Sequence, residues 1–142
     1  MFLTEEHELM RKLVRQFAET ELTDDVLDEA EEKEYISPAV LRKMADAGFL
    51  GVKIPKEYGG AGGDCRAYVI VMEEVSRVSP AAALFAAGPS SLAGTPFLLS
   101  GTEEQRQKYL PPAVRGEKTN VFALTEPGAG SDAGSLLTTA VA

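Results

Sequence analysis

The sequence has 142 residues with 22 acidic and 14 basic side chains, which gives a formal net charge of −8. At this length we expect one domain, or one domain and a piece of a second. Residues 1–34 hold 12 acids and 4 bases, whereas residues 35–142 hold 10 of each. The whole excess of negative charge therefore lies in residues 1–34. This distribution argues against nucleic-acid binding and against a polybasic membrane surface, since both need clustered Lys and Arg.

Several other protein classes are excluded by composition. The chain is 44% hydrophobic and 25% charged, which is typical of a globular protein. The single cysteine, Cys65, excludes an internal disulfide framework and a cysteine-rich metal site. The N-terminus is acidic and has no apolar segment, so we expect neither a secretory signal nor a transit peptide. Pro80, Pro89 and Pro96 interrupt the longest uncharged run, so we expect a cytoplasmic protein without membrane insertion.

The N-terminal third predicts helices. Residues 4–21 have an amphipathic pattern, with Thr4 as the candidate N-cap. Residues 24–34 hold seven acids and one Lys around three apolar residues, which predicts a hydrated helix face. A metal site or a site for a basic partner is the alternative there. Ser37 and Pro38 predict the start of another helix, which ends at Gly48.

A short extended segment is predicted for residues 49–55. It leads into residues 58–63, where four glycines permit backbone conformations closed to other residues. The spacing of these glycines matches neither a dinucleotide-binding nor a Walker-type phosphate loop. A tight structural turn is therefore the favoured interpretation.

The central segment predicts two apolar helices. Asp64 can cap a helix that reaches about Val78, and Ser79-Pro80 opens a second that reaches residues 98–99, with a break near Gly88-Pro89. Only three charged residues occur among the 32 residues from Tyr68 to Leu99. Helices as apolar as this are buried on most sides, so we expect them to pack against protein that this chain does not supply.

The pattern changes near residue 118. Thr102 and Gln105 form a capping box that opens a short helix, expected to end before Pro111-Pro112. Residues 119–125 and 136–141 are predicted to be strands. The predicted fold class is therefore all-α, with a helical domain over residues 1–118 and the start of a truncated β domain over residues 119–142.

The loop from Glu126 to Gly134 is the most specific part of the sequence. Its small residues expose backbone amides to which a flat ring or a phosphate can come close, and Thr125 and Ser131 add hydroxyls. Glu126 and Asp132 have no His nearby, so we expect no metal site, and Asp132 is expected to hold the turn through its own backbone. The residues alone leave two interpretations, a ligand-binding loop and a plain connection between strands.

Residues 123–135, ALTEPGAGSDAGS, resemble the flavin-binding signature of the acyl-CoA dehydrogenase family at every constrained position. Residues 46–51 and 54–60 resemble the family's segment after its second helix. Residues 100–105 and 108–111 resemble the stretch before its first β-domain strand. The resemblance covers essentially the whole chain, in order and with normal spacing. It implies the helical N-terminal domain of that family and the opening of its middle β domain.

The resemblance also implies a chemistry. Family members bind FAD and oxidise an acyl-CoA to the trans-2-enoyl-CoA in fatty acid metabolism, and a carboxylate base removes the α-proton. An electron-transferring flavoprotein is the implied electron acceptor, and the full-length form is expected to be a homo-oligomer. Phe122, Leu124 and Thr125 would lie along the flavin ring, and Ser131 would contact the CoA of the substrate. The implied cofactor-binding residues are Phe122, Ala123, Leu124, Thr125, Glu126, Pro127, Gly128, Ala129, Gly130 and Ser131.

The family's catalytic base has no counterpart in this sequence. Glu126 belongs to the signature loop and is not a candidate for that role, so no catalytic residue is assigned and the chain alone is expected to be inactive. Helices near residues 81–99 line the family's acyl pocket, where the small residues Ala86, Ala87 and Gly88 would leave room for substrate. The alternative function is a non-catalytic helical module that assembles with a full-length or complementary subunit.

Overall fold

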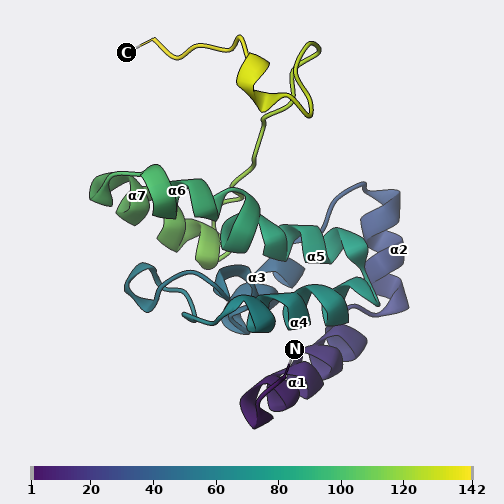
Figure 1. The fold of residues 1–142 in the computed structure, drawn as a ribbon. Coiled ribbons are helices and arrows are strands. Elements are labelled where there is room, and N and C mark those ends of the chain that lie inside the picture. Colours follow the sequence, from purple (N-terminus) through teal and green to yellow (C-terminus); the bar gives the residue numbers. More distant parts are fainter. Residues whose placement is uncertain (1, 142) are drawn as a thin grey trace.

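The computed structural model describes residues 2–141 and shows a bundle of α-helices from which a C-terminal arm extends (Figure 1). The α-helices are α1 (Glu5–Glu21), α2 (Asp24–Glu32), α3 (Pro38–Asp46), α4 (Cys65–Ser76), α5 (Pro80–Ala87), α6 (Gly94–Ser100) and α7 (Glu103–Val114). Short 3₁₀ turns are η1 (Phe49–Gly51), η2 (Lys56–Tyr58) and η4 (Ala133–Ser135), and η3 (Gly88–Leu92) is a π-helix. The predicted helical class is confirmed.

Local side-chain caps start most of these helices, as the sequence predicted. At each capped start, a side-chain oxygen accepts the backbone N–H three residues further on. The capping residues are Thr4, Ser37, Asp64, Ser79 and Thr102. At the last of them the Gln105 side chain also accepts the Thr102 N–H at 2.8 Å, which completes the predicted capping box.

The main core lies among α1, α3, α4 and α5. Fully buried side chains from three of these helices meet there, among them Val14, Met44, Ile70, Val71 and Val75. α1 packs along α4, and α4 packs against α5. The hydrophobic effect of this burial is the main stabilising contribution to the bundle. The apolar face of α4 is thus covered within the chain itself, without outside protein.

Other apolar side chains remain uncovered. The exposed fractions of Leu84, Leu92 and Leu99 are 64%, 48% and 77%. These residues lie on α5, η3 and α6, and for this side of the molecule the packing against outside protein stays a prediction. α2, in contrast, has no fully buried residue, and the side chains of its acids lie at the surface, as predicted for a hydrated helix.

The predicted break near Gly88-Pro89 is a π-helical turn between α5 and α6. A Cβ atom on Gly94 would lie 1.7 Å from the carbonyl oxygen of Pro89, so only glycine fits there. Ser90 is buried, and its hydroxyl donates to the carbonyl of Leu50 at 2.9 Å, which ties the turn to η1. The run Pro80–Ser100 passes length and composition criteria for a membrane span, but it is not one regular helix, and 44% of its most apolar window is buried inside the protein.

The prediction of an extended segment over residues 49–55 was wrong. Its first residues form the 3₁₀ turn η1, Val52 has helical dihedral angles, and the Ile54 N–H donates to the Gly51 carbonyl at 3.1 Å. Phe49, Leu50, Val52 and Ile54 are all buried, whereas a half-buried strand alternates between buried and exposed residues. Burial on every side therefore favours a compact turn inside the bundle.

The glycine-rich residues that follow form the tight structural turn that was predicted. Gly59 and Gly62 have φ values of 84° and 66°, which favour glycine. A Cβ atom on Gly60 would lie 2.0 Å from the Ile54 carbonyl oxygen. The Gly62 N–H donates to that same carbonyl at 2.9 Å, so this loop folds back onto the preceding turn.

Helix α7 does not end before Pro111-Pro112 as predicted but runs through both prolines to Val114. Each proline removes a backbone donor, which opposes a helix at this position. Leu110 and Val114 are buried in a second, smaller core cluster with Ile54 and Tyr58, and this packing holds the last turn together. Tertiary burial thus outweighs the local preference.

The predicted strands over residues 119–125 and 136–141 are not formed as strands. Within residues 2–141 the only β-type pairing is an isolated bridge between Glu126 and Ala129. A strand is stabilised by the backbone hydrogen bonds of a neighbouring strand, and the described chain offers no such neighbour. These residues instead form the arm that leads away from α7 in Figure 1.

Candidate functional site

The first part of the arm carries several free hydrogen-bond donors. Asn120 anchors its start through a bond from Nδ2 to the carbonyl of Tyr109 at 3.4 Å. Beyond it, residues 121–125 are exposed, and their backbone N–H groups have no acceptor among residues 2–141. Phe122, Ala123, Leu124 and Thr125, the predicted flavin contacts, lie in this stretch. Their amides are therefore available to a bound molecule.

A tight turn follows, from Glu126 to Ala129. The backbone groups of these two residues exchange hydrogen bonds at 3.0 and 3.1 Å, and Pro127 and Gly128 form the tip. Ala129 is buried, although the residues around it are exposed. The turn is therefore a small folded unit that precedes Gly130 and Ser131.

The Glu126 carboxylate closes the arm into a loop. Its two oxygens accept the backbone N–H groups of Leu137 and Thr138, at 2.9 and 2.8 Å. Hydrogen bonds from Thr138 and from the backbone of Leu137 lower the pKa of the Glu126 carboxyl below its usual value. Such a carboxylate is ionised and already holds two donors, so it is a poor proton acceptor. The structure thus gives Glu126 a role in shaping the loop.

The signature loop leaves space around its glycines and hydroxyls. A Cβ atom on Gly128 or Gly130 would meet no other atom within 4 Å, and neither residue has a positive φ. The Thr125 and Ser131 hydroxyls form no hydrogen bond within the part of the chain described by the structure. Nothing in the chain's own packing therefore requires glycine at these two positions, and a ligand has room to come close to the backbone.

Asp132 stabilises the end of the loop through its own backbone, as predicted, and also through its side chain. Its carboxylate accepts the Ser135 hydroxyl at 2.5 Å, and its carbonyl accepts the Ser135 N–H at 3.1 Å. The side-chain bond to Ser135, three residues on, is therefore added to the backbone bond that closes the turn. The described chain, residues 2–141, contains no group of three His, Cys, Asp or Glu residues that could hold a metal ion.

A cavity of about 460 Å³ lies where the arm leaves the bundle. It is lined by Leu84, Phe85, Gly88, Leu92, Thr119, Asn120, Val121 and Phe122. Five of these eight residues have apolar side chains, beside the polar Thr119 and Asn120, so the cavity suits a mainly apolar group. Of the residues predicted to contact flavin, Phe122 lines this cavity, and the others follow it along the arm.

The sequence located this cavity only in part. Gly88 lines it as expected, but Ala86 and Ala87 are buried in the bundle and do not. A Cβ atom on Gly88 would lie 3.3 Å from the Asn120 carbonyl oxygen, so glycine lets the arm come close to α5. Leu84 and Leu92 were not identified as lining residues from the sequence. Each lies four residues from Gly88, a spacing that places all three on one face of a helix.

Comparison with known proteins adds independent findings. The family model described as the acyl-CoA dehydrogenase N-terminal domain matches residues 4–117. The chain is 59% identical over 140 residues to the 3-(aryl)acrylate reductase of Clostridium sporogenes, which covers 99% of this chain and 37% of that protein. It is 57% identical over 141 residues to the caffeyl-CoA reductase-Etf complex subunit CarC of Acetobacterium woodii, with the same coverage of 99% and 37%.

Solved structures have the same fold. The Bacillus anthracis acyl-CoA dehydrogenase complexed with FAD matches with a TM-score of 0.83 and 35% identity, over 94% of this chain and 23% of that one. A chain from the Acidaminococcus fermentans study of an electron transferring flavoprotein matches with a TM-score of 0.83 and 36% identity, over 95% of this chain and 35% of that one. The chain therefore spans little more than a third of the relatives' length.

Proposed function

This chain belongs to the acyl-CoA dehydrogenase family, and from that membership we propose that it is the N-terminal part of an FAD-dependent enzyme acting on the Cα–Cβ bond of an acyl-CoA. The proposed reaction is oxidation of the acyl-CoA to the trans-2-enoyl-CoA. The observation that carries it is the apolar cavity beside α5, which continues into an arm where the backbone amides of residues 121–125 and the Thr125 hydroxyl have no hydrogen-bond partner among residues 2–141. Residues 119–142 are proposed to open the enzyme's β domain.

The flavin would be held by residues 122–131. FAD, when bound, supplies the acceptor for the hydride that leaves the β-carbon. The chain's own part is to bind and orient. The amides of residues 122–125 and the Thr125 hydroxyl would donate to the polar edge of the ring, and Ser131 would contact the CoA. The open space at Gly128 and Gly130 supports this assignment, because a flat ring needs close access to the backbone.

The acyl group would occupy the cavity between α5, η3 and the arm. Leu84, Leu92 and Phe122 would exclude water from the carbon chain, and Gly88 would leave the width that the chain needs. The carboxylate base is proposed to come from a part of the enzyme outside these 142 residues, because Glu126 is held by Leu137 and Thr138. We expect no turnover from this chain alone.

A second candidate is the reverse reaction, the reduction of a 3-aryl-2-enoyl-CoA. Two relatives, at 59% and 57% identity, are named as reductases of an aryl acrylate and of caffeyl-CoA. Phe85 and Phe122 both line the cavity, and aromatic side chains pack well against an aryl ring. An electron-transferring flavoprotein is the proposed redox partner, and the intact enzyme is proposed to be a homo-oligomer.

The flavin assignment is tested by Thr125→Val in the intact enzyme. Loss of the hydroxyl should lower the FAD content and shift the visible absorption spectrum. Thr139→Val is the matched control, since Thr139 is exposed and outside the signature loop. Unchanged flavin content and spectrum in Thr125→Val would remove Thr125 from the site, and robust acyl-CoA oxidation by the 142-residue chain would show that a base is present in it.

A further inference from the structure

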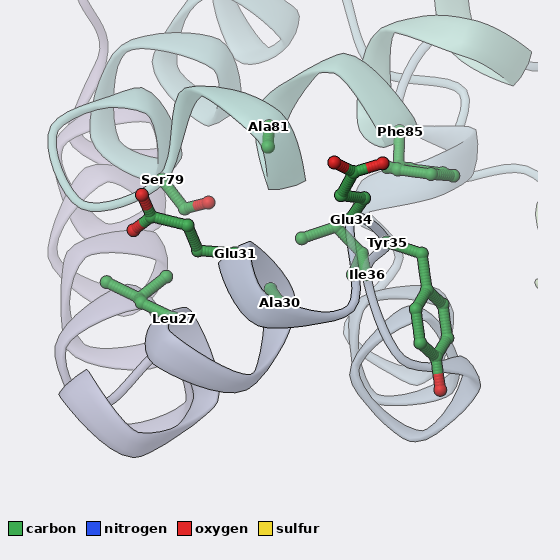
Figure 2. A pocket seen from close by; sticks show the side chains of 9 residues that line it. All are labelled: Leu27, Ala30, Glu31, Glu34, Tyr35, Ile36, Ser79, Ala81 and Phe85. Carbon is green, nitrogen blue, oxygen red and sulfur yellow. The ribbon is translucent and has the colours of Figure 1, made fainter.

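An apolar groove lies between the end of α2, the turn that follows it and the first turns of α5 (Figure 2). Its volume is about 440 Å³. The apolar part of its lining consists of Leu27, Ala30, Ile36, Ala81 and Phe85. The groove is distinct from the cavity beside the arm, since the two share only Phe85. The proposed reaction gives it no role.

Two carboxylates line the groove together with these apolar groups. Glu31 and Glu34 are exposed, and Figure 2 shows the carboxylates of both pointing toward α5. Neither forms an ion pair or a side-chain hydrogen bond within residues 2–141, whereas nearby Glu29 is paired with Lys33 at 2.5 Å. Residues 24–34 hold seven acids and one base, so the potential at the mouth of the groove is strongly negative.

The backbone holds Glu34 in an unusual conformation. Its φ is 53°, in the left-handed region that favours glycine. The Glu34 and Tyr35 N–H groups donate to the carbonyls of Glu31 and Ala30, at 3.3 and 3.1 Å, which is the helix-ending motif that most often carries glycine at this position. The carboxylate of Glu34 therefore lies at the groove at a position where glycine would relieve backbone strain.

We propose that this groove docks a basic amphipathic segment of a partner protein. One large apolar side chain of the partner would lie on Ala30, Ala81 and Phe85, and a Lys or Arg beside it would pair with Glu31 and Glu34. Charge complementarity selects this occupant, because the groove joins an apolar floor to two unpaired carboxylates. A second copy of this chain fits poorly, since its net charge is also −8.

The experiment uses the full chain and a synthetic amphipathic helix of Leu and Lys as the probe. Its dissociation constant is measured by calorimetry, and its position by methyl chemical shifts of Ala30 and Ala81. The double variant Glu31→Gln/Glu34→Gln should weaken binding at least fivefold. The matched control is Asp28→Asn/Glu32→Gln, which removes the same charge from exposed positions of α2 that do not line the groove. It should weaken binding less than twofold.

Each other result would overturn the proposal. If both double variants weakened binding equally, the probe would respond to net charge alone. If a helix of Leu and Glu bound as tightly as the helix of Leu and Lys, the carboxylates would not select a basic partner. Shifts that leave Ala30 and Ala81 unchanged would place the probe elsewhere. If the chain self-associated and Glu31→Gln/Glu34→Gln abolished this self-association, the groove would be assigned to a second copy of the chain. If the intact enzyme proposed above failed to bind the probe, its remaining polypeptide would cover the groove.

Discussion

The carboxylate of Glu74 is buried and accepts two hydrogen bonds from the guanidinium of Arg15, at 2.8 and 2.9 Å. Arg15 lies on α1 and Glu74 on α4, so the pair joins the two helices that pack along each other at one side of the core. Hydrogen bonds from Arg15 lower the pKa of the Glu74 carboxyl, although burial opposes this shift. The buried carboxylate is therefore ionised in the folded protein.

Substitution of Glu74 should be costly. In Glu74→Gln the Arg15 guanidinium loses its buried partner, and we expect the free energy of unfolding to fall by about 2 kcal/mol, less than for a fully buried pair because Arg15 can reach water. Urea denaturation measures this. The control is Glu73→Gln, whose carboxylate is half exposed and lies 3.2 Å from Arg11; it should cost about 0.5 kcal/mol or less. Equal losses would contradict the special role of Glu74.

The same pair makes stability depend on acid pH. Because the folded-state pKa of Glu74 is lowered, its contribution is present above the unfolded-state pKa of about 4.3 and is lost as the pH falls through the folded-state pKa. Wild type should therefore lose more stability than Glu74→Gln when denaturation is repeated at decreasing pH below about 4.3. Parallel pH profiles for the two proteins would rule out this linkage.

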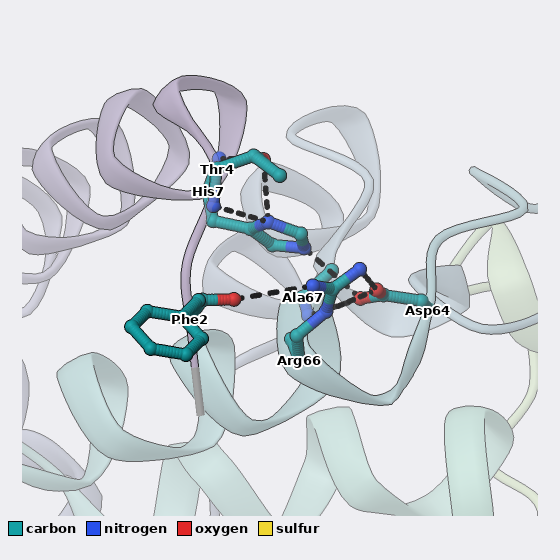
Figure 3. A network of polar contacts seen from close by, with 6 residues as sticks. All are labelled: Phe2, Thr4, His7, Asp64, Arg66 and Ala67. Atoms are coloured by element: carbon teal, nitrogen blue, oxygen red, sulfur yellow. Dashed lines mark hydrogen bonds and ion pairs between the residues drawn. The ribbon is translucent and has the colours of Figure 1, made fainter.

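His7 connects the start of α1 to the start of α4 (Figure 3). Its Nδ1 accepts from the Thr4 N–H and hydroxyl at 3.2 and 2.7 Å, which leaves the Nε2–H to donate to Asp64 at 3.1 Å. His7→Gln should keep the acceptor for the Thr4 N–H, whereas His7→Ala loses it and retains only the Thr4 cap on the residue 7 N–H. Loss of this half of the capping box should cost about 0.5 kcal/mol. Thermal melts should therefore rank wild type first, His7→Gln second and His7→Ala last. A melt of His7→Ala that matches His7→Gln would show that the cap contributes nothing.

Glycine at position 34 should stabilise the protein. Glu34 has a φ of 53°, and Glu34→Gly relieves this strain, for a net gain of about 0.5 kcal/mol after the added chain entropy of glycine in the unfolded state. Glu32 is the last residue of α2 and has no positive φ, so Glu32→Gly should instead lose about 0.5 kcal/mol. Chemical denaturation of both variants tests the sign of each effect. A loss in Glu34→Gly would mean that the carboxylate itself stabilises the turn.

Substitution by alanine should be costly at one glycine and nearly neutral at another. In Gly94→Ala the added Cβ would meet the Pro89 carbonyl at 1.7 Å, so we expect a loss of about 3 kcal/mol or more. In Gly128→Ala the added Cβ meets nothing within 4 Å, and the free energy of unfolding should change by less than about 0.5 kcal/mol. Similar denaturation midpoints for the two variants would contradict the packing at the π-helical turn.

Features set by neighbouring residues could be predicted from the sequence. The capping box at Thr102 and Gln105 depends on groups three residues apart, so the start of α7 followed from the pattern. The end of α7 did not, because burial of Leu110 and Val114 against Ile54, more than 50 residues away, carries the helix through Pro111-Pro112. The predicted strands failed for a related reason, since no partner strand accompanies them in the described chain.

The candidate site also has a part that the sequence predicted and a part that only the structure shows. The family resemblance alone points to residues 123–135 as a flavin-binding loop, and this assignment stays a prediction. The cavity needed the structure, because the small residues Ala86 and Ala87 lie on the buried side of α5 while Leu84 and Leu92 face the arm. The role of Glu126 also needed it, since its partners Leu137 and Thr138 lie 11 and 12 residues along the chain.

The arm has a consequence for folding cooperativity. No backbone N–H of residues 121–125 finds an acceptor in the described chain. The loop beyond them is closed within the arm, where the Glu126 carboxylate accepts the N–H groups of Leu137 and Thr138. The turn can therefore open without disturbing the bundle, so this chain has at least two independent unfolding equilibria. A denaturation curve followed by helical circular dichroism would report the bundle, while amide exchange at residues 121–125 would proceed at the rate of an unstructured peptide.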